Sequence, residues 1–415
     1  MPPCPNLHQA LSVNPIYITI MQHLLHRFKT LVAQTSKHPL AIEISRAEGM
    51  YLYGPDGNRY LDLVAGINVN HLGHSPPPVV SAVKNQAERY MHVMVYGEYI
   101  QHPQVALAAE LSGLLPPSLN CTYFVNSGTE AIEGALKLAK RYTGRNEIIA
   151  FRNAYHGSTH GSLSLMSSGN QKRPFQPLLP GIRHINFNSI EALEAITQQT
   201  ACVVAEPVRG SAGVIAADKV FLKKLKQRCD QTKTLLLFDE IQTGFGRTGS
   251  MFSFEQYEVV PHILALGKAM GAGMPLAAFV ASHEMMDSLT HNPMLGHITT
   301  FGGNAVCCAA GLAGLKMLTE SKLIAQVKDK EALFVKKLTH PAIKAVRSQG
   351  LLIAIEFDSL EFNLKVINKC IENRVITFPF LLAENCMRIS PPLIITEQEI
   401  EQAVDVILRS IEQVS

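Results

Sequence analysis

The chain contains 415 residues, of which 47% are hydrophobic and 17% charged, and it carries a formal net charge of +3. This composition is typical of a folded globular protein, and the length predicts one large domain plus a smaller one. The mild net charge, with lysines and arginines scattered along the sequence, argues against nucleic acid as a partner, and no apolar run approaches the length of a membrane span.

The N-terminal part, residues 1–75, is predicted to be a loosely attached segment followed by a ribbon of short strands. Its first six residues have neither the charged start nor the apolar core of a signal peptide. Residues 5–40 are predicted to be helical. Residues 42–45 and 50–63 predict short strands around the turn Pro55-Asp56-Gly57. We expect this antiparallel ribbon to belong to a small domain.

Strand-like and helical runs alternate between residues 76 and 315, which we predict to be the large domain. Strands are expected at residues 121–125, 148–151, 202–205, 235–238, 263–266 and 276–280. Apolar strands separated by helices imply a sheet covered on both faces, so the fold class is α/β with a mostly parallel sheet. Residues 316–415 place a strand-like run at 351–357 among helices, which predicts a C-terminal α+β small domain.

The eight cysteines are spread along the chain without C-x-x-C pairs or neighbouring histidine clusters. This spacing favours reduced, mostly buried thiols in a cytoplasmic protein over a disulfide framework or a metal site.

An aspartate and a lysine at two predicted strand ends indicate the chemistry. Asp239 ends the apolar run that begins at Thr234, and Lys268 lies 29 residues later on a turn of small residues. A lysine in this setting can form a Schiff base with a carbonyl cofactor. An aspartate at the end of a buried strand can keep a pyridinium nitrogen protonated, which pyridoxal 5'-phosphate (PLP) needs to act as an electron sink.

The stretch from Ser127 to Glu130 is a candidate phosphate site. It follows a predicted strand and precedes a helix whose apolar residues recur at helical spacing from Ile132 onwards. Ser127 and Glu130 have the spacing of a capping box, so the helix should begin here. The free amides of a helix N-terminus, together with Gly128 and the hydroxyls of Ser127 and Thr129, suit an anion. Taken alone, the same stretch is equally typical of ordinary helix capping.

Four chemically useful residues, Ser127, Glu206, Asp239 and Lys268, fall at or just after the ends of predicted strands. Ligands of open parallel sheets bind outside the carboxyl ends of the strands. We therefore expect these four side chains to share one edge of the sheet.

With these residues in view, the chain resembles the class III PLP-dependent aminotransferases, and within them the acetylornithine and ornithine aminotransferase branch. The resemblance covers nearly the whole chain and implies PLP-dependent transferase fold type I, with a seven-stranded type of sheet. It also implies a homodimer whose active sites lie at the subunit interface. The motifs that carry it are Asn126-Ser-Gly-Thr-Glu130, Tyr155-His-Gly157, Glu206-Pro207, Phe238-Asp-Glu-Ile-Gln242, Gly244-Phe-Gly-Arg-Thr-Gly249, Gly267-Lys268, Thr300-Phe-Gly-Gly-Asn304 and Arg388-Ile-Ser-Pro-Pro392.

The resemblance implies roles around the cofactor ring. Lys268 would hold the cofactor covalently and later move a proton between substrate and cofactor, for which its pKa must lie well below the free value of about 10.4. Asp239 would pair with the pyridine nitrogen, and Gln242 with the phenolic oxygen. Ile241 would pack on one ring face and Tyr155 on the other.

The resemblance also implies roles at the phosphate and the substrate. Gly128 and Thr129, next to Ser127, would donate to the phosphate. Thr300 would reach the phosphate of the neighbouring subunit's cofactor, a role that rests on the resemblance alone. Arg388 would bind the substrate α-carboxylate, a task that suits a bidentate guanidinium.

Two further residues, His156 and Glu206, fall in the motifs that the resemblance places around the cofactor. By its own chemistry, however, a histidine such as His156 is more often a structural residue with satisfied hydrogen bonds.

The chain departs from the resemblance at two positions. Many relatives that act on glutamate and 2-oxoglutarate have an arginine where this chain has Ser158, and relatives commonly have a glutamate where it has Ser211. Arg209 could restore a positive charge nearby, but its direction cannot be read from the sequence. These differences are also similar to the pyruvate-using ω-amine and ω-amino acid branch.

We therefore predict a cytoplasmic, homodimeric, PLP-dependent aminotransferase with a ping-pong cycle. The expected donor is an ω-amino or basic amino acid such as ornithine or N-acetylornithine, and the acceptor is a 2-oxo acid. The alternatives are an ω-amine or ω-amino acid:pyruvate aminotransferase, or another class III PLP reaction (aminomutase, racemase or decarboxylase). A non-enzymatic protein on this fold is disfavoured because Lys268 and Asp239 are both present. A dinucleotide-dependent dehydrogenase is disfavoured because no G-x-G-x-x-G follows a strand.

Overall fold

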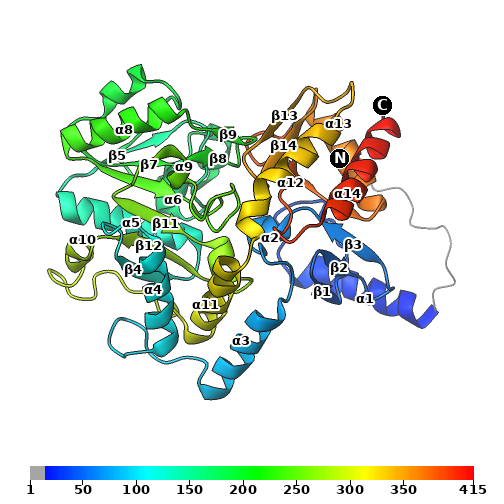
Figure 1. The fold of residues 1–415 in the computed structure, drawn as a ribbon, viewed down its shortest axis with the longest axis horizontal. Coiled ribbons are helices and arrows are strands. Elements are labelled where there is room, and N and C mark those ends of the chain that lie inside the picture. Colours follow the sequence, from blue (N-terminus) through cyan, green and yellow to red (C-terminus); the bar gives the residue numbers. More distant parts are fainter. Residues whose placement is uncertain (1–14) are drawn as a thin grey trace. The chain divides into compact units, whose positions relative to one another are not determined.

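The structure is a computed structural model that describes residues 15–415 (Figure 1). Two compact units are distinguished, one formed by the residues up to 46 together with 53–58, and one by residues 47–52 together with 59–415. The first unit contains helix α1 (Pro15–Leu31), as predicted for this part of the chain; residues 1–14 lie outside the described residues. The expected domain boundaries near residues 75 and 315 stay predictions. Within the described part of the chain, no helix is both long and apolar enough to cross a membrane.

The helices of the second unit are α2 (Ala65–Asn68), α3 (Pro77–Arg89), α4 (His102–Leu114), α5 (Gly128–Thr143), α6 (His160–Ser164), α7 (Gly169–Lys172), α8 (Lys219–Thr232), α9 (Phe254–Tyr257), α10 (His283–Asp287), α11 (Ala305–Glu320), α12 (Leu323–Lys337), α13 (Leu360–Glu372) and α14 (Glu397–Glu412), with short 3-10 turns η1 (Arg173–Phe175), η2 (Glu191–Ala195) and η3 (Lys268–Gly271). The strands are β1 (Arg46–Glu48), β2 (Tyr51–Tyr53), β3 (Arg59–Asp62), β4 (Cys121–Val125), β5 (Glu147–Phe151), β6 (Ile182–Ile185), β7 (Thr200–Ala205), β8 (Val208–Arg209), β9 (Ile215–Ala216), β10 (Leu235–Asp239), β11 (Ile263–Leu266), β12 (Ala277–Ala281), β13 (Ala345–Ser348), β14 (Ile353–Glu356), β15 (Val375–Ile376), β16 (Phe378–Pro379) and β17 (Cys386–Ile389).

The largest sheet has seven strands in the order β4-β12-β11-β10-β7-β5-β6. β10 runs parallel to β11 and β7, and β5 runs parallel to β7 and β6. β12 is antiparallel to both of its neighbours. The predicted α/β class with a mostly parallel sheet is therefore confirmed, and the carboxyl ends of β4, β7, β10 and β11 lie at one edge.

Both faces of this sheet are buried, which explains why its strands read as continuous apolar runs. Leu236 and Phe238 of β10 belong to one apolar cluster, together with Phe221 of α8. Leu237, on the opposite face, belongs to a second cluster with Ile132 of α5. Helices on both sides thus hold the strand that carries Asp239 at its end.

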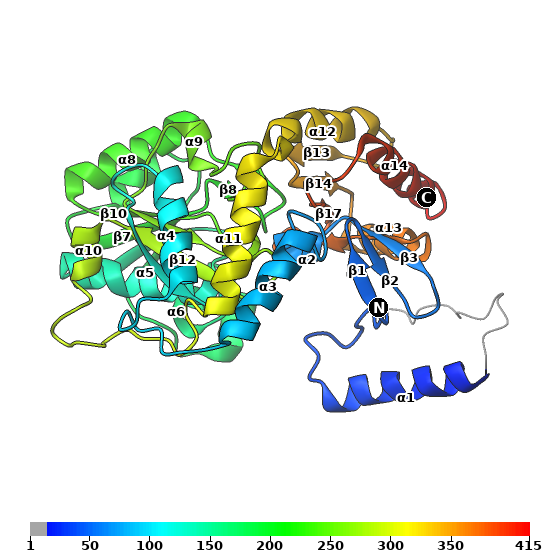
Figure 2. The ribbon, with the colours of Figure 1, turned by 60° about the horizontal axis from the view of Figure 1, so that its bottom comes forward.

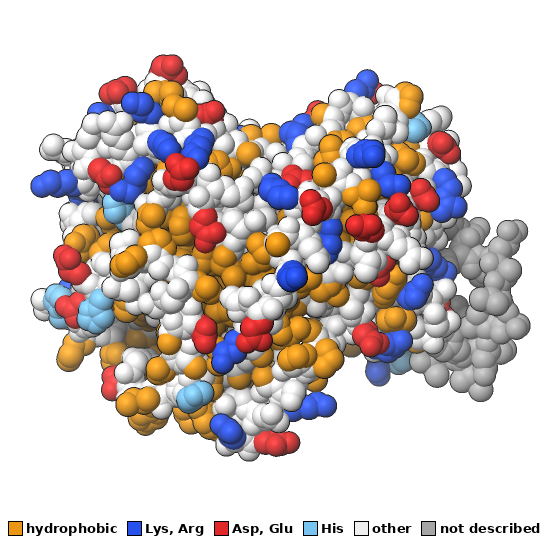
Figure 3. Space-filling view, in the orientation of Figure 1, with side chains coloured by type: hydrophobic (Ala, Val, Ile, Leu, Met, Phe, Trp, Pro, Cys, Tyr) orange, Lys and Arg blue, Asp and Glu red, His pale blue; other side chains and the backbone are white. Residues whose placement is uncertain are grey.

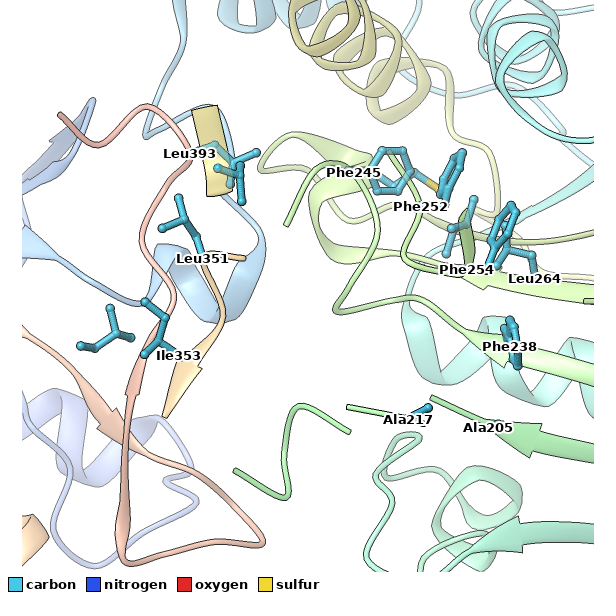
Figure 4. Packing of buried hydrophobic residues seen from close by; sticks show 14 of the residues in the cluster. Ala205, Ala217, Phe238, Phe245, Phe252, Phe254, Leu264, Leu351, Ile353 and Leu393 are labelled. Carbon is cyan, nitrogen blue, oxygen red and sulfur yellow. The ribbon is translucent and has the colours of Figure 1, made fainter. Parts of the chain in front are cut away.

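Further aromatic side chains cover the first of these faces. Figure 4 shows Phe245, Phe252 and Phe254 grouped beside Leu264 of β11. The rings of Phe252 and Phe254 are stacked, with centroids 5.9 Å apart. Helices α3, α4 and α11 lie alongside one another at the margin of the sheet (Figures 1 and 2).

A second, antiparallel sheet in the C-terminal part has the order β13-β14-β17-β16 and carries Arg388 on β17. The ribbon of β8 and β9 packs against it, because Val208 and Val214 share an apolar cluster with Ala354 and Phe380. The N-terminal ribbon forms a third sheet, β1-β2-β3-β15, whose last strand comes from residues 375–376.

Two differences from the predicted elements have local causes. The strand expected at residues 42–45 is wrong, since β1 begins at Arg46; of the expected run, Ser45 alone bonds to β2, through its N–H to the Tyr53 carbonyl at 2.8 Å. Strand β6 was not predicted because its sequence, Ile-Arg-His-Ile, is half polar. It is an edge strand, where one side of the ladder faces solvent.

Candidate active site

Lys268 lies at the end of β11, on the 3-10 turn η3, with the left-handed φ of +49°. The residue before it, Gly267, is packed tightly: an added Cβ would lie 3.3 Å from Ile241 Cγ2 and 3.3 Å from Ala277 Cβ. Burial lowers the pKa of Lys268 to about 8, while the charges of Asp239 and Glu206 raise this pKa and that of Arg388 lowers it. The turn therefore presents an amine that is partly neutral near neutral pH.

Asp239 ends β10 with a buried carboxylate. Its Oδ1 accepts from the backbone N–H of Ile241 at 3.1 Å, and its Oδ2 lies 2.8 Å from Nδ1 of His156. Burial acts to lower the pKa of His156, but the hydrogen bond and charge of Asp239 and the charge of Glu206 leave this pKa raised. His156 is thus part of the Asp239 site and not an isolated structural histidine.

Glu206 follows β7 and is also buried. Burial raises its pKa to about 7, against the effect of His156, which lowers it. The Glu206 carboxylate accepts from the backbone N–H of Tyr155 at 3.2 Å, and the Tyr155 hydroxyl lies 3.2 Å from Ser158 Oγ. The structure therefore brings together residues that the sequence places 51 positions apart.

Helix α5 begins at Gly128, as predicted, with Ser127 as its N-cap. Ser127 Oγ accepts from Glu130 N at 3.4 Å, but the Glu130 carboxylate returns to Asn126 N at 2.7 Å instead of closing the box on Ser127. A Cβ added at Gly128 would lie 2.8 Å from Ile241 Cγ2, so this turn presses against the loop after β10. The candidate phosphate turn is thereby fixed beside Asp239.

Gln242 lies on the same loop after β10 and is buried. Its Nε2 lacks a hydrogen-bond partner among the described residues. Gly210 packs directly on it, since a Cβ there would lie 2.5 Å from Gln242 Oε1. Sequence reasoning gave Gly210 no role, and a single glycine after a short strand offered no signal for one.

Arg388 on β17 is a buried guanidinium with 5% exposure. Its Cζ lies 4.5 Å from the ring centroid of Phe380, and its Nε and Nη1 have no partner in the part of the chain that the structure describes. Burial lowers the pKa of Arg388 to about 10. A buried cation without a partner is unfavourable alone, and it fits an anionic ligand.

Thr300 is exposed and is not brought to the cluster around Asp239 and Lys268. The residue before it, Thr299, accepts from Asn126 Nδ2 at 3.0 Å, which ties this loop to the turn before α5. Arg209 is directed elsewhere: its Nη1 donates to the Arg152 carbonyl at 2.7 Å, and its Cζ lies 4.2 Å from the Phe187 ring centroid.

Three side chains around Thr129 were also missed by sequence reasoning, namely Glu133, Thr159 and Ser162. Thr159 follows the motif Tyr155-His-Gly157 and is the N-cap of α6, which is the one sequence signal that could have found it.

The residues present fit PLP. Buried polar atoms without a partner among the described residues include Nε2 of His156, Nε2 of Gln242, and Nε and Nη1 of Arg388. Buried polar groups normally have partners, so these atoms indicate a ligand rich in hydrogen-bonding oxygens. The N-terminus of α5, a buried carboxylate and a lysine of lowered pKa lie at the same sheet edge.

Comparison with known proteins gives a consistent result. A family model described as aminotransferase class-III matches residues 32–411. A protein of Methanocaldococcus jannaschii named acetylornithine aminotransferase is 40% identical over 382 residues, which is 88% of this chain and 92% of the relative. The structure of ornithine aminotransferase from Toxoplasma gondii, which has partial occupancy of PLP at its active site, superimposes with a TM-score of 0.88 at 29% identity, covering 98% of this chain and 99% of that one. An adenosylmethionine-8-amino-7-oxononanoate aminotransferase from M. jannaschii gives a TM-score of 0.87 at 29% identity, covering 94% and 99%.

Proposed function

The chain belongs to the class III aminotransferase family, and we propose that it uses PLP to move an amino group from an ω-amino or basic amino acid to a 2-oxo acid. The acetylornithine and ornithine aminotransferases among its relatives support a donor of the ornithine or N-acetylornithine type. The observation that carries the proposal is Lys268, whose pKa burial lowers to about 8 and on which the charges of Asp239, Arg388 and Glu206 all act.

The residues at the sheet edge divide the work around the cofactor ring. When bound, PLP supplies an electron-accepting ring that stabilises the negative charge left as a proton leaves the substrate carbon that bears the transferred amino group. Lys268 would hold the cofactor covalently and, once displaced by substrate, would take and return that proton, because its lowered pKa leaves a usable fraction neutral near pH 7. Asp239, held by His156 at 2.8 Å, keeps a proton on the ring nitrogen. Gln242 donates to the phenolic oxygen.

The remaining residues position the two ends of the reactants. Ser127, Gly128 and Thr129 bind the phosphate at the N-terminus of α5, where backbone amides and the helix dipole favour an anion. Arg388 binds the substrate α-carboxylate with two N–H groups, which gives its buried charge a partner. Tyr155 contributes an aromatic face.

A homodimer with shared active sites is part of the proposal. Side chains of segments 91–105 and 294–301 are exposed although they are apolar, with Ile100 96% and Met294 77% accessible. The two segments are joined: the rings of His92 and Phe301 lie 4.9 Å apart. Figure 3 shows hydrophobic side chains gathered on this side of the molecule. A large exposed apolar patch is typical of an interface, and Thr300 belongs to the second of these segments, which supports the proposal that it reaches a second copy.

A cytoplasmic location is also proposed. The seven cysteines that the structure describes are free, and burial raises the pKa of Cys202 to about 12. Buried, unpaired thiols suit a reducing compartment.

The acceptor has a second candidate. Ser158, which stands where relatives that use 2-oxoglutarate have an arginine, is neutral, exposed and hydrogen-bonded to Tyr155, and Arg209 is directed by its Nη1 toward the Arg152 carbonyl. This favours an ω-amino acid:pyruvate aminotransferase over one that uses 2-oxoglutarate.

The test follows the two half-reactions separately. Purified protein carrying PLP is mixed with N-acetylornithine, ornithine, 4-aminobutyrate or a simple amine without any oxo acid, and loss of the yellow absorbance is recorded. We expect bleaching by one of the first three, followed by recovery of the colour on adding 2-oxoglutarate or pyruvate. Borohydride treatment should place the mass of the reduced cofactor on the peptide that contains Lys268. A protein that takes up no PLP would refute the proposal, and bleaching by none of the donors would refute the donor class.

A further inference from the structure

The hydroxyl of Thr129, on the first turn of α5, lies inside a compact group of polar side chains. Thr129 Oγ1 is 2.6 Å from Thr159 Oγ1 and 2.6 Å from Ser162 Oγ, and the last two atoms are 2.9 Å apart. The backbone N–H of Thr159 also donates to Thr129 Oγ1, at 3.3 Å. Three hydroxyls and one amide therefore share a small volume next to the candidate phosphate turn.

Glu133, one helical turn after Thr129 on α5, closes this group. Its Oε1 accepts from Thr159 Oγ1 at 2.5 Å, from Gly161 N at 2.8 Å and from Ser162 N at 3.1 Å. Thr159 is the N-cap of α6, a position whose hydroxyl normally accepts from the amides of the first turn. Here the carboxylate of Glu133 takes those amides, so the Thr159 hydroxyl is released for another task.

The backbone permits this arrangement only because two residues lack a side chain. A Cβ at Gly157, whose φ is +126°, would lie 2.4 Å from Thr129 Oγ1 and 2.7 Å from Ser162 Oγ. A Cβ at Gly161 would lie 2.1 Å from Glu133 Oε2. The close approach of both segments is thus built into the fold.

Counting protons assigns directions to these bonds. An ionised carboxylate only accepts, so the single proton of Thr159 is committed to Glu133, and Thr159 Oγ1 can only accept from its neighbours. Ser162 is fully buried and can donate to Thr129 Oγ1 or to the Thr159 carbonyl, 3.2 Å away. Thr129 Oγ1 can accept from both Thr159 N and Ser162 Oγ, which leaves its own proton free to point at a ligand.

We infer that Glu133, Thr159 and Ser162 form a positioning chain that holds the Thr129 hydroxyl so that its O–H can turn from Thr159 Oγ1 to the phosphate of the cofactor. The inference rests on the proposed function, because it requires that α5 binds that phosphate. Without a ligand, the Thr129 O–H donates to Thr159 Oγ1. With a phosphate oxygen present, the Thr129 O–H donates to that oxygen, while Thr129 Oγ1 still accepts from Thr159 N and Ser162 Oγ. No buried hydroxyl in this described group loses its partner in either state, so the switch carries little cost.

The test compares two ligands that differ only in the phosphate. Full-length, cofactor-free protein is titrated with PLP and with pyridoxal, and the dissociation constants are measured by absorbance for wild type and for Thr159→Val. Valine removes the hydroxyl but keeps the shape and the N–H to Thr129. The Kd for PLP should fall about tenfold, the worth of one hydrogen bond, because Thr159 Oγ1 no longer competes with the phosphate for the Thr129 proton, while the Kd for pyridoxal changes by less than about twofold.

Two further variants separate positioning from structure. Thr159→Val should add nothing to a Thr129→Val protein, since it acts through that hydroxyl. Thr143→Val is the matched control at the other end of α5, where the hydroxyl donates only to the Ala139 carbonyl at 2.7 Å; its PLP to pyridoxal ratio should stay at the wild-type value. Ser162→Ala replaces Thr159→Val if the latter does not fold.

The outcomes distinguish failure of the proposed phosphate site from failure of the positioning chain alone. A wild-type protein that binds PLP no more tightly than pyridoxal refutes the phosphate site and the proposed function with it. A wild-type protein that prefers PLP, but whose preference is unchanged in Thr159→Val or Ser162→Ala, overturns the positioning chain alone. Equal weakening of both ligands, or additive effects with Thr129→Val, also overturns it, because a merely structural role would have that result.

Discussion

Replacing Arg388 by methionine should make the cofactor-free protein more stable and should greatly raise the KM of the PLP-loaded enzyme for its donor. The guanidinium is charged at pH 7 in both the folded and the unfolded chain, but burial lowers its folded pKa from 12.5 to about 10. At about 1.4 kcal/mol per pKa unit, burying this charge costs the folded state roughly 3 kcal/mol. The contact with the Phe380 ring returns about 1–2 kcal/mol, so Arg388→Met should raise the free energy of unfolding by about 1–2 kcal/mol.

The assay is denaturant unfolding of the cofactor-free protein at pH 7, together with the donor half-reaction of the PLP-loaded enzyme. The KM for a donor that carries an α-carboxylate, such as ornithine or N-acetylornithine, should rise by about a hundredfold or more, since a buried charge pair between that carboxylate and Arg388 is lost. Arg247→Met is the matched control: burial lowers the pKa of this arginine to about 9, but it donates to His71 Nε2, the Leu351 carbonyl and the Pro391 carbonyl. That variant should be destabilised, because three acceptors lose their donor. A clear loss of stability in Arg388→Met would refute the reasoning, as it would mean that Arg388 is held by partners within the protein.

Three further predictions concern the sheet edge. Gly128→Ala should weaken PLP binding and cost about 1–3 kcal/mol of unfolding free energy, because the added methyl lies 2.8 Å from Ile241 Cγ2. A second substitution, Ile241→Val, removes Cδ1 and should restore part of both losses. A Kd for PLP that is unchanged in Gly128→Ala would contradict this tight packing. The rate at which PLP enters the cofactor-free protein should rise with pH and level off above about 8, since only neutral Lys268 reacts; a rise continuing to pH 10 would exclude the lowered pKa. Asp239→Asn should lower turnover about a hundredfold or more. The same change should lower the pKa of His156, which NMR titration measures. A His156 pKa that stays raised in this variant would show that Asp239 does not cause the raised value.

Much of the sheet edge could be predicted because local sequence specifies it. Apolar runs as short as Ile263–Leu266 locate strands, and the carboxyl ends of parallel strands lie at one edge of the sheet, so the sequence predicts Asp239 and Lys268 close together. The start of α5 followed from Ser127 in the same way. These predictions need only the period of the apolar residues and one topological rule.

The remaining contacts join segments whose approach no local pattern encodes. His156 looked like a structural histidine because nothing in the sequence says that its ring meets a carboxylate 83 residues later. The direction of Arg209 depends on the Arg152 carbonyl and the Phe187 ring, which belong to other strand ends. Gly210 is meaningful only once Gln242 is seen against it. Such contacts between distant residues depend on how the whole sheet packs, so local patterns in a single sequence do not predict them.

The same burial pushes the two kinds of titratable group at this edge in opposite directions. It raises the pKa of Glu206 to about 7 and lowers that of Lys268 to about 8, because in both cases the charged form loses hydration. Arg388 is also buried, so in the cofactor-free protein burial disfavours the charged forms of Glu206, Lys268 and Arg388. The cofactor supplies an anionic phosphate, and the substrate supplies a carboxylate. Binding of these anions therefore offsets part of the free-energy cost of burying the charged side chains. The site is therefore expected to couple stability to occupancy. PLP together with a substrate carboxylate should raise the unfolding midpoint by more than the contact area implies, and most of that excess should be lost in a variant that combines Arg388→Met with Lys268→Met.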